Sequence, residues 1–149
     1  MQYEWGMQKD FQKWHTLKSY IEEFHPAPLF CEREIWWCSL GANVGVEEDG
    51  KNQFFERPIL VYRKFNKEML WAIPMTSRER EGKFYFSFPL HGIKRTVILS
   101  QIRVLSAKRL VRRVGKMSAM QFRFLEDSFQ TFIKKTDPVR GPRVPNGNL

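Results

Sequence analysis

The sequence is poor in the residues that bind metals or form disulfides. It contains two cysteines, Cys31 and Cys38, and three histidines scattered along the chain. The spacing of the cysteines is not that of a zinc site, and no histidine pairs with a cysteine or a carboxylate at the spacing of metal ligands. We therefore expect reduced, partly buried thiols, no metal site and no other cofactor.

Long apolar runs are also absent. No run approaches the roughly 20 residues that a bilayer span needs, so we expect neither a membrane span nor a membrane partner. The N-terminal stretch "MQYEWGMQKDFQKW" lacks the charged-then-apolar pattern of a secretory signal. The sequence therefore predicts a cytoplasmic protein.

Acidic residues are the scarcer charged class, with 16 Asp and Glu against 25 Lys and Arg, so the net charge is +9. Such an excess favours a polyanionic partner, most often nucleic acid. A basic tail on an otherwise inert protein gives the same sum, so the distribution of the charges matters more than the total. One run stands out, because five cations lie within nine positions that contain no acidic residue: Lys108, Arg109, Arg112, Arg113 and Lys116.

Apolar and aromatic residues are abundant. Hydrophobic residues make up 42% of the chain, with 13 Phe and 5 Trp, which argues against global disorder. A length of 149 residues is typical of one domain with extensions. We predict an N-terminal helical extension at residues 1–31, a barrel domain with a C-terminal helix at 32–136, and a flexible tail at 137–149 that is rich in proline and glycine.

Two segments show the period of an amphipathic helix. In residues 7–24 the apolar residues recur at steps of three and four: Phe11, Trp14, Leu17, Ile21 and Phe24. The two prolines of "HPAPLF" end this helix. A second helix, capped by Ser118, is predicted to run through Lys135 and to end at Asp137-Pro138. Its apolar stripe consists of Phe122, Leu125, Phe129 and Phe132.

The remaining pattern predicts short strands rich in large β-forming residues. They lie at 34–40, 58–63, 69–75, 83–90 and 96–105. The segment between the first two strands, "GANVGVEEDGKNQFFE", is a long loop, and such loops in compact domains are often functional. Short strands with few helices predict a mainly β fold, a small antiparallel barrel with a helix packed outside at each end.

The second and third predicted strands bring two polar residues together. If the hairpin turns within "KFNKE", antiparallel pairing places Arg57 opposite Thr76, with their Cβ atoms about 5 Å apart. Pro58 fits this arrangement because a residue without an N–H suits the start of a strand. Two alternatives stay open: Arg57 pairs with Glu56 or Glu47 on the surface, and Thr76 is an ordinary strand residue.

Several stretches together resemble the MazF/PemK family of toxin–antitoxin endoribonucleases. They are "EIWWCSLGANVG", "RPILVY", "AIPMTS", "TVILSQIRVLSAKRL" and "VGKMS", and they occur in the family's order over about residues 33 to 133. The resemblance implies a small SH3-like antiparallel barrel of the CcdB/MazF type, usually a homodimer. It also implies metal-independent, sequence-selective cleavage of single-stranded RNA such as mRNA, and restraint by a cognate acidic antitoxin.

The resemblance also assigns catalytic residues. Arg57 lies where the family carries its catalytic arginine before proline, and Thr76 lies where it carries its catalytic threonine. RNA supplies its own nucleophile, the 2′-OH, so the enzyme needs only to align that group and to stabilise charge on the phosphate. A guanidinium donates bidentately to phosphate, and a hydroxyl donates to another oxygen or relays a proton. The expected products are a 2′,3′-cyclic phosphate and a 5′-OH end.

Further residues are expected to bind the RNA, with Gln101 at a position that the family associates with base contact. The expected set is Gly45, Val46, Glu47, Ser77, Ser100, Gln101, Arg103, Lys108, Arg109 and Arg112. The basic run has two alternatives, a solvated face or a docking site for an acidic antitoxin. The aromatic residues Trp36, Trp37 and the row Phe84, Phe86 and Phe88 stack on bases or pack in the core, and core packing is favoured.

Three departures from the family pattern leave a rival hypothesis. Arg33-Glu34 replaces the usual glycine-aspartate pair, Val46 replaces a small polar loop residue, and the loop before Arg57 is longer. The rival is a catalytically inactive barrel that binds nucleic acid or a protein partner. A gyrase-directed poison on the same barrel is a third option, but it needs no arginine that stabilises phosphate.

Overall fold

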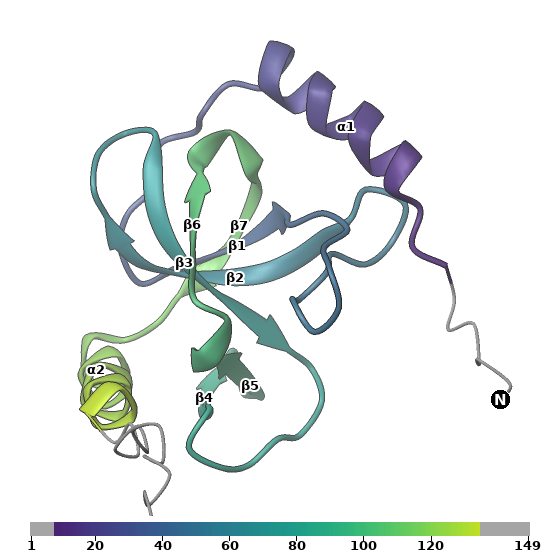
Figure 1. Cartoon of the computed structure of the whole chain (residues 1–149). Coiled ribbons are helices and arrows are strands. Elements are labelled where there is room, and N and C mark those ends of the chain that lie inside the picture. The colour runs from purple at the N-terminus through teal and green to yellow at the C-terminus, as the bar shows by residue number, and fades with distance from the viewer. Residues whose placement is uncertain (1–7, 135–149) are drawn as a thin grey trace, which may run out of the picture.

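The computed structural model describes residues 8–134, which form two α-helices and a mainly antiparallel sheet of seven strands (Figure 1). The helices are α1 (Phe11–Phe24) and α2 (Ala119–Lys134). The strands are β1 (Glu34–Ser39), β2 (Glu56–Lys64), β3 (Met69–Thr76), β4 (Tyr85–Leu90), β5 (Ile93–Ile98), β6 (Arg103–Ser106) and β7 (Leu110–Lys116). Two 3-10 turns, η1 (Leu99–Gln101) and η2 (Ala107–Arg109), flank β6. The predicted fold class is confirmed.

The strand β3 joins the two halves of the sheet. The order is β4-β5-β3-β2-β1-β7, and β6 pairs with β3 beside this path. The first half of β3 pairs with β2 and β6, whereas Met75 and Thr76 pair with Val97 and Thr96 of β5. Among residues 8–134, no ladder joins β4 to β7, so the sheet curves without closing. The end of β3 is therefore the place where the two halves diverge.

Both faces of the central strands are buried, because alternate side chains of a strand point to opposite faces. On one face Ile35, Leu60 and Ile73 pack with β4, β5 and α2. On the other, Trp36, Ile59 and Ala72 pack with side chains from β6 and β7. The near-continuous apolar runs of β1, β2 and β3 follow from this two-sided burial.

The helices lie at opposite ends of the molecule in Figure 1. Ser118 caps α2 as predicted, since its Oγ accepts from the Gln121 amide at 3.2 Å. The predicted stripe faces the core, with Phe122, Leu125 and Phe129 buried. The predicted end at Lys135, the stop at Asp137-Pro138 and the tail 137–149 lie outside the described residues. No helix in the described part is long and apolar enough to cross a bilayer.

At the other end, α1 packs through Trp14 and Ile21, with Asp10 as its N-cap. Only these two residues of the predicted stripe are buried, and Phe11 and Phe24 are 50% and 62% exposed. The helix therefore packs on the rest of the chain through a narrow part of its surface. Its main neighbours are Ala42 and Phe55, the two ends of the long loop.

The predicted strand at 96–105 is wrong as one element. The chain forms β5, turns through η1 and continues as β6, because β5 and β6 pair with different parts of β3. The strand β7 was not predicted either. It pairs only with β1 among the described strands, so its charged side chains lie in solvent and hide the apolar alternation on which strand prediction depends.

Candidate functional site

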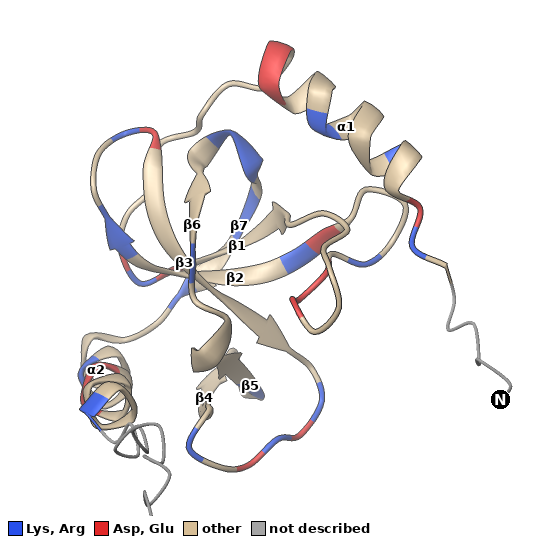
Figure 2. Cartoon of the chain, viewed as in Figure 1, with Lys and Arg blue, Asp and Glu red and all other residues tan. Residues whose placement is uncertain are grey.

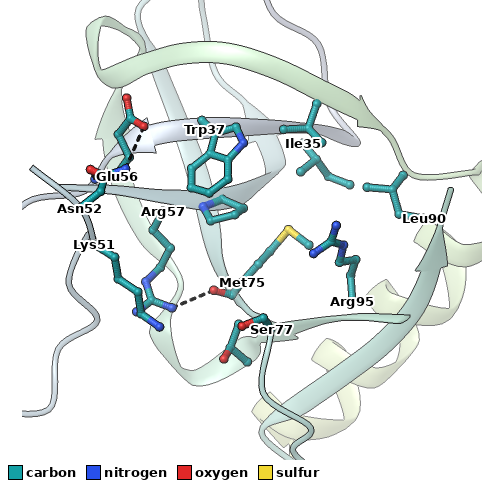
Figure 3. A pocket seen from close by; sticks show the side chains of 13 residues that line it. Ile35, Trp37, Lys51, Asn52, Glu56, Arg57, Met75, Ser77, Leu90 and Arg95 are labelled. Atoms are coloured by element: carbon teal, nitrogen blue, oxygen red, sulfur yellow. Dashed lines mark hydrogen bonds between the residues drawn. The ribbon is translucent and has the colours of Figure 1, made fainter. Parts of the chain in front are cut away.

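A cavity of about 330 Å³ opens where β3 leaves β2. The expected catalytic pair, Arg57 and Thr76, lines it together with Ser77 (Figure 3). The other lining residues come mainly from β1, β2, β5 and the end of the long loop. They are Ile35, Trp37, Lys51, Asn52, Glu56, Pro58, Met75, Leu90, Arg95 and Val114. The pocket lining thus combines apolar side chains with three cations, Lys51, Arg57 and Arg95, and Arg95 lies across the pocket from the other two (Figure 3).

The strand register explains why these residues meet. The predicted hairpin register holds from the pair Ile59–Pro74 to the pair Val61–Ala72, and a bulge shifts it by one residue nearer the turn. The β2–β3 ladder ends at Ile59, because Met75 and Thr76 pair with β5. The predicted cross-strand pair of Arg57 and Thr76 is therefore wrong, since Arg57 pairs with Cys38 of β1. The Arg57 side chain bridges the resulting gap, since its Nη1 donates to the Met75 carbonyl at 2.9 Å.

Arg57 is 8% exposed, and protein groups engage all three of its nitrogens. Nε donates to the Asp49 carbonyl at 2.5 Å, and Nη2 lies 2.8 Å from a carboxylate oxygen of Glu48. The alternative of a surface pair with Glu56 or Glu47 is therefore wrong. The carboxylate partner is Glu48, and it belongs to the long loop.

Thr76 presents a hydroxyl that is available to donate. Its Oγ1 accepts from the Arg78 amide at 3.2 Å, which leaves the hydroxyl hydrogen for another acceptor. The residue is half-buried and ends β3, and Ser77 follows it at an exposed position. A donor fixed by a backbone amide is well suited to a phosphate oxygen.

A second cavity is lined by four other residues of the expected RNA-binding set: Glu47, Ser100, Gln101 and Arg103. The Gln101 side chain is tied to the loop on both edges. Its Oε1 accepts from the Glu48 amide at 3.1 Å, and its Nε2 donates to the Val46 carbonyl at 3.0 Å. The loop thus uses one acceptor site and one N–H of the Gln101 amide, and the expected contact of Gln101 with a base stays a prediction.

The loop tip itself is exposed. Gly45 has a φ of 57°, a left-handed conformation that glycine adopts without strain, and the Val46 side chain is 92% exposed. The tip thus presents its carbonyls to Gln101 and its side chains to solvent. The position at Val46 offers no hydroxyl or amide to a substrate.

Two members of the basic run lie against α1. Lys108 Nζ donates to the Glu22 carbonyl at 2.8 Å. The guanidinium of Arg109 donates to the Ser39 and Leu40 carbonyls at 3.2 and 3.3 Å and lies 5.5 Å from the Trp14 ring. Burial lowers the pKa of Arg109 from its usual range. The expectation that Lys108 and Arg109 bind RNA stays a prediction, and both have structural partners here.

Arg112 lies differently. Its side chain is 58% exposed, stacks 4.8 Å from the ring of Trp37 and lies 3.8 Å from Glu56. Both of these neighbours line the pocket. The guanidinium of Arg112 therefore lies beside the pocket and largely in solvent.

The sequence did not single out Glu48, Lys51 and Arg95 as site residues, and it took Trp37 mainly as core. Trp37 is half-buried in the pocket wall, whereas Trp36 is only 7% exposed in the core. Alternation along β1 assigns the two tryptophans to opposite faces, and that signal was available. Arg95 gave no local signal, because its proximity depends on β5 pairing with the last residues of β3.

The chain is strained where the loop enters β2. Asn52 and Phe55 have φ angles of 60° and 53°, a region that costs an ordinary residue such as Phe roughly 1–2 kcal/mol. Gly50 is required beside them, because a Cβ there would lie 1.6 Å from the Phe55 carbonyl oxygen. This backbone conformation sets the direction in which the chain leaves the loop and continues to Glu56 and Arg57.

Fold and site together define a small β-protein with a buried arginine, a donor hydroxyl and further cations around one pocket. Such a pocket suits a phosphate-bearing ligand. The family model described as PemK-like, MazF-like toxin of type II toxin-antitoxin system matches residues 32–133, and the chain belongs to this family. A search of curated protein sequences gave no match.

Solved structures share the fold. MazF from Deinococcus radiodurans is 19% identical, with a TM-score of 0.59 over 72% of this chain and 98% of that one. An endoribonuclease in complex with its cognate antitoxin, from a mycobacterial species, is 13% identical, with a TM-score of 0.57 over 74% and 100%. The Mycobacterium tuberculosis toxin MazF-mt6 is 15% identical, with a TM-score of 0.53 over 68% and 97%.

Proposed function

We propose that this protein is the toxin of a type II toxin–antitoxin system and a metal-independent, sequence-selective endoribonuclease for single-stranded RNA. The observation that carries the proposal is that Arg57 and Thr76 line one pocket at the end of β3. Membership of the family supports it, and so does the solved fold relative described as an endoribonuclease.

The chemistry follows from the two donors. The ribose 2′-OH attacks the adjacent phosphorus and gives its proton to water, while the bond from phosphorus to the 5′-oxygen breaks. The 5′-oxygen takes a proton from water, so the products are a 2′,3′-cyclic phosphate and a 5′-OH end. Arg57 neutralises the charge that grows on the phosphate oxygens. Its pKa makes it a poor base, so its work is electrostatic. Thr76 donates its free hydroxyl hydrogen to a second oxygen, and the pocket walls hold the flanking nucleotide in line.

A non-catalytic binding protein is the second candidate. The observation that favours it is that three of the five guanidinium N–H groups of Arg57 are already engaged, by Glu48, Asp49 and Met75. The Glu48 carboxylate also offsets the positive charge that an enzyme would present to phosphate. A binding module does not depend on that charge.

One experiment separates the two candidates. The protein is incubated with a long single-stranded RNA in EDTA, and the 5′ and 3′ ends of the products are mapped. The enzyme gives cuts at a recurring short sequence with cyclic-phosphate ends, which Arg57→Ala removes and Thr76→Val slows by about 100-fold. Arg63→Ala, at an exposed arginine of the same strand, is the matched control and cuts normally. Intact RNA with salt-sensitive binding would favour the second candidate.

The partners are proposed on the same basis. We infer a cognate acidic antitoxin, because the net charge of +9 favours an acidic ligand and fold relatives are solved with antitoxins. A short acidic reading frame next to the gene, whose product blocks RNA cleavage, would support this inference. We also infer a homodimer, and light scattering at a mass near 17.9 kDa would contradict it.

A further inference from the structure

We propose that Lys9, in the segment just before α1, is a positioning residue that holds the 43–49 loop closed over Arg57. It thereby sets how readily a phosphate reaches the guanidinium. The functional half of this inference rests on the proposed nuclease function. The structural half, the bracing of the loop, does not.

Lys9 contacts both arms of the loop. Its Nζ donates to the Asn43 carbonyl at 2.6 Å and to the Gly45 carbonyl at 3.4 Å, and it forms an ion pair with Asp49 at 2.9 Å. The arms also bind each other, since the Asn43 amide donates to Asp49 Oδ1 at 2.6 Å. One ammonium group therefore joins residues at both ends of the 43–49 loop.

The same loop covers the catalytic guanidinium. Glu48 and the Asp49 carbonyl engage Nη2 and Nε of Arg57. Figure 2 shows this acidic segment against the start of β2. A carboxylate and a phosphate accept from the same guanidinium N–H groups, so Glu48 and an RNA phosphate compete for Nη2 and for the charge of Arg57. Closing the loop therefore weakens the interaction of Arg57 with the substrate.

An apolar anchor fixes Lys9 in place. Trp14 of α1 is 7% exposed, and its ring lies 5.5 Å from that of Phe55. The helix also approaches Gly41 closely, since a Cβ there would lie 2.4 Å from the Trp14 ring. Both Lys9 and α1 precede residues 32–133, which the family model matches.

The expected effect is on substrate saturation. When only a fraction of the molecules is open, the apparent affinity falls by that fraction. Lys9→Met keeps most of the side-chain length and removes the charge, so the open fraction rises. Half-saturation of cleavage should need about 3- to 10-fold less RNA, with kcat unchanged.

The test compares Lys9→Met with Lys18→Met, which removes the same charge from an exposed position on α1. Losing a cation elsewhere weakens RNA binding slightly, so the two variants shift in opposite directions. Hydrogen exchange of residues 43–50 gives a readout that needs no activity. The Glu48 amide bonded to Gln101 and the Gly50 amide bonded to Gly41 should exchange faster in Lys9→Met only. Lys9→Arg should restore both properties.

The outcomes decide separately on the brace and on the nuclease. Unchanged exchange in Lys9→Met overturns the brace. Faster exchange with half-saturation unchanged, or moved as in Lys18→Met, overturns the control of access to Arg57. If no variant cuts RNA, the proposed function fails. Binding of a 2′-O-methyl RNA, which lacks the nucleophile, then decides whether Lys9→Met opens a phosphate site.

Discussion

At the scale of single residues, the site depends on which hydrogen-bond donors of each polar group have no protein partner. Thr76 Oγ1 accepts from a backbone amide and keeps its hydrogen. Arg57 has three of its five N–H groups engaged, one of them by the Glu48 carboxylate. The threonine hydroxyl is therefore free to donate, whereas Glu48 competes with a phosphate for the arginine.

Thr76→Val tests the hydroxyl at nearly constant shape. We expect single-turnover cleavage of RNA to fall by about 100-fold, the cost of losing one donor to a transition-state oxygen. Thr76→Ser keeps the donor and should retain most of the rate. Equal losses in the two variants would mean that packing, and not the hydroxyl, explains the effect of Thr76.

The two cysteines should differ in reactivity. Burial raises the pKa of the Cys38 thiol to about 12, whereas Cys31 is exposed. The thiolate is the reactive form, so iodoacetamide at pH 8 should modify Cys31 alone in the folded protein and both thiols in urea. Mass spectrometry of peptides reads the result. Rapid labelling of Cys38 without denaturant would show that β1 opens.

At the scale of elements, the start of β1 has an unusual backbone. Arg33 has a φ of 71°, and it occupies the place where the family pattern usually has glycine. Its amide donates to the Val61 carbonyl and its carbonyl accepts from the Met117 amide, both at 2.8 Å. These two bonds connect β1 with β2 and with the segment before α2, and they hold the residue in a strained conformation.

Arg33→Gly should therefore stabilise the fold. The left-handed conformation costs an L-residue roughly 1–2 kcal/mol, and glycine gives back about 0.5–1 kcal/mol through the entropy of the unfolded chain. We expect a gain of up to about 1 kcal/mol in the free energy of unfolding, measured by urea titration. Arg63→Gly, within β2 and without a positive φ, should lose stability. A loss in both variants would contradict the strain.

The sequence predicts the elements whose pattern of apolar residues reflects burial. It does not predict the features that depend on pairing between segments far apart in the sequence. The helices follow from periodicity and the first four strands from runs of large β-forming residues. One turn predicts the β2–β3 register only between Ile59 and Val61, because a bulge shifts the pairs nearer the turn. The break at η1 and the strand β7 depend on which parts of β3 and β1 remain free to pair. Glu48 and Arg95 reach the site for the same reason, since no local pattern places them.

At the scale of the whole molecule, the cations of the basic run point in two directions. Arg109 lies inward, between α1 and β1, whereas Arg112 lies outward, beside the pocket. Figure 2 shows cations on η2, which carries Arg109, and on β7, which carries Arg112. The net charge of +9 therefore overstates the surface that a polyanion meets.

Salt dependence distinguishes Arg109 from Arg112. If Arg112 contacts a phosphate, Arg112→Gln should reduce the slope of log affinity against log salt by about 0.7 for single-stranded RNA. Arg109→Gln should leave the slope unchanged and lower thermal stability instead, because its carbonyl partners lose their donor. Fluorescence anisotropy with a labelled 2′-O-methyl RNA measures both slopes without cleavage. Equal reductions would mean that α1 moves away on binding and that the whole basic run faces the RNA.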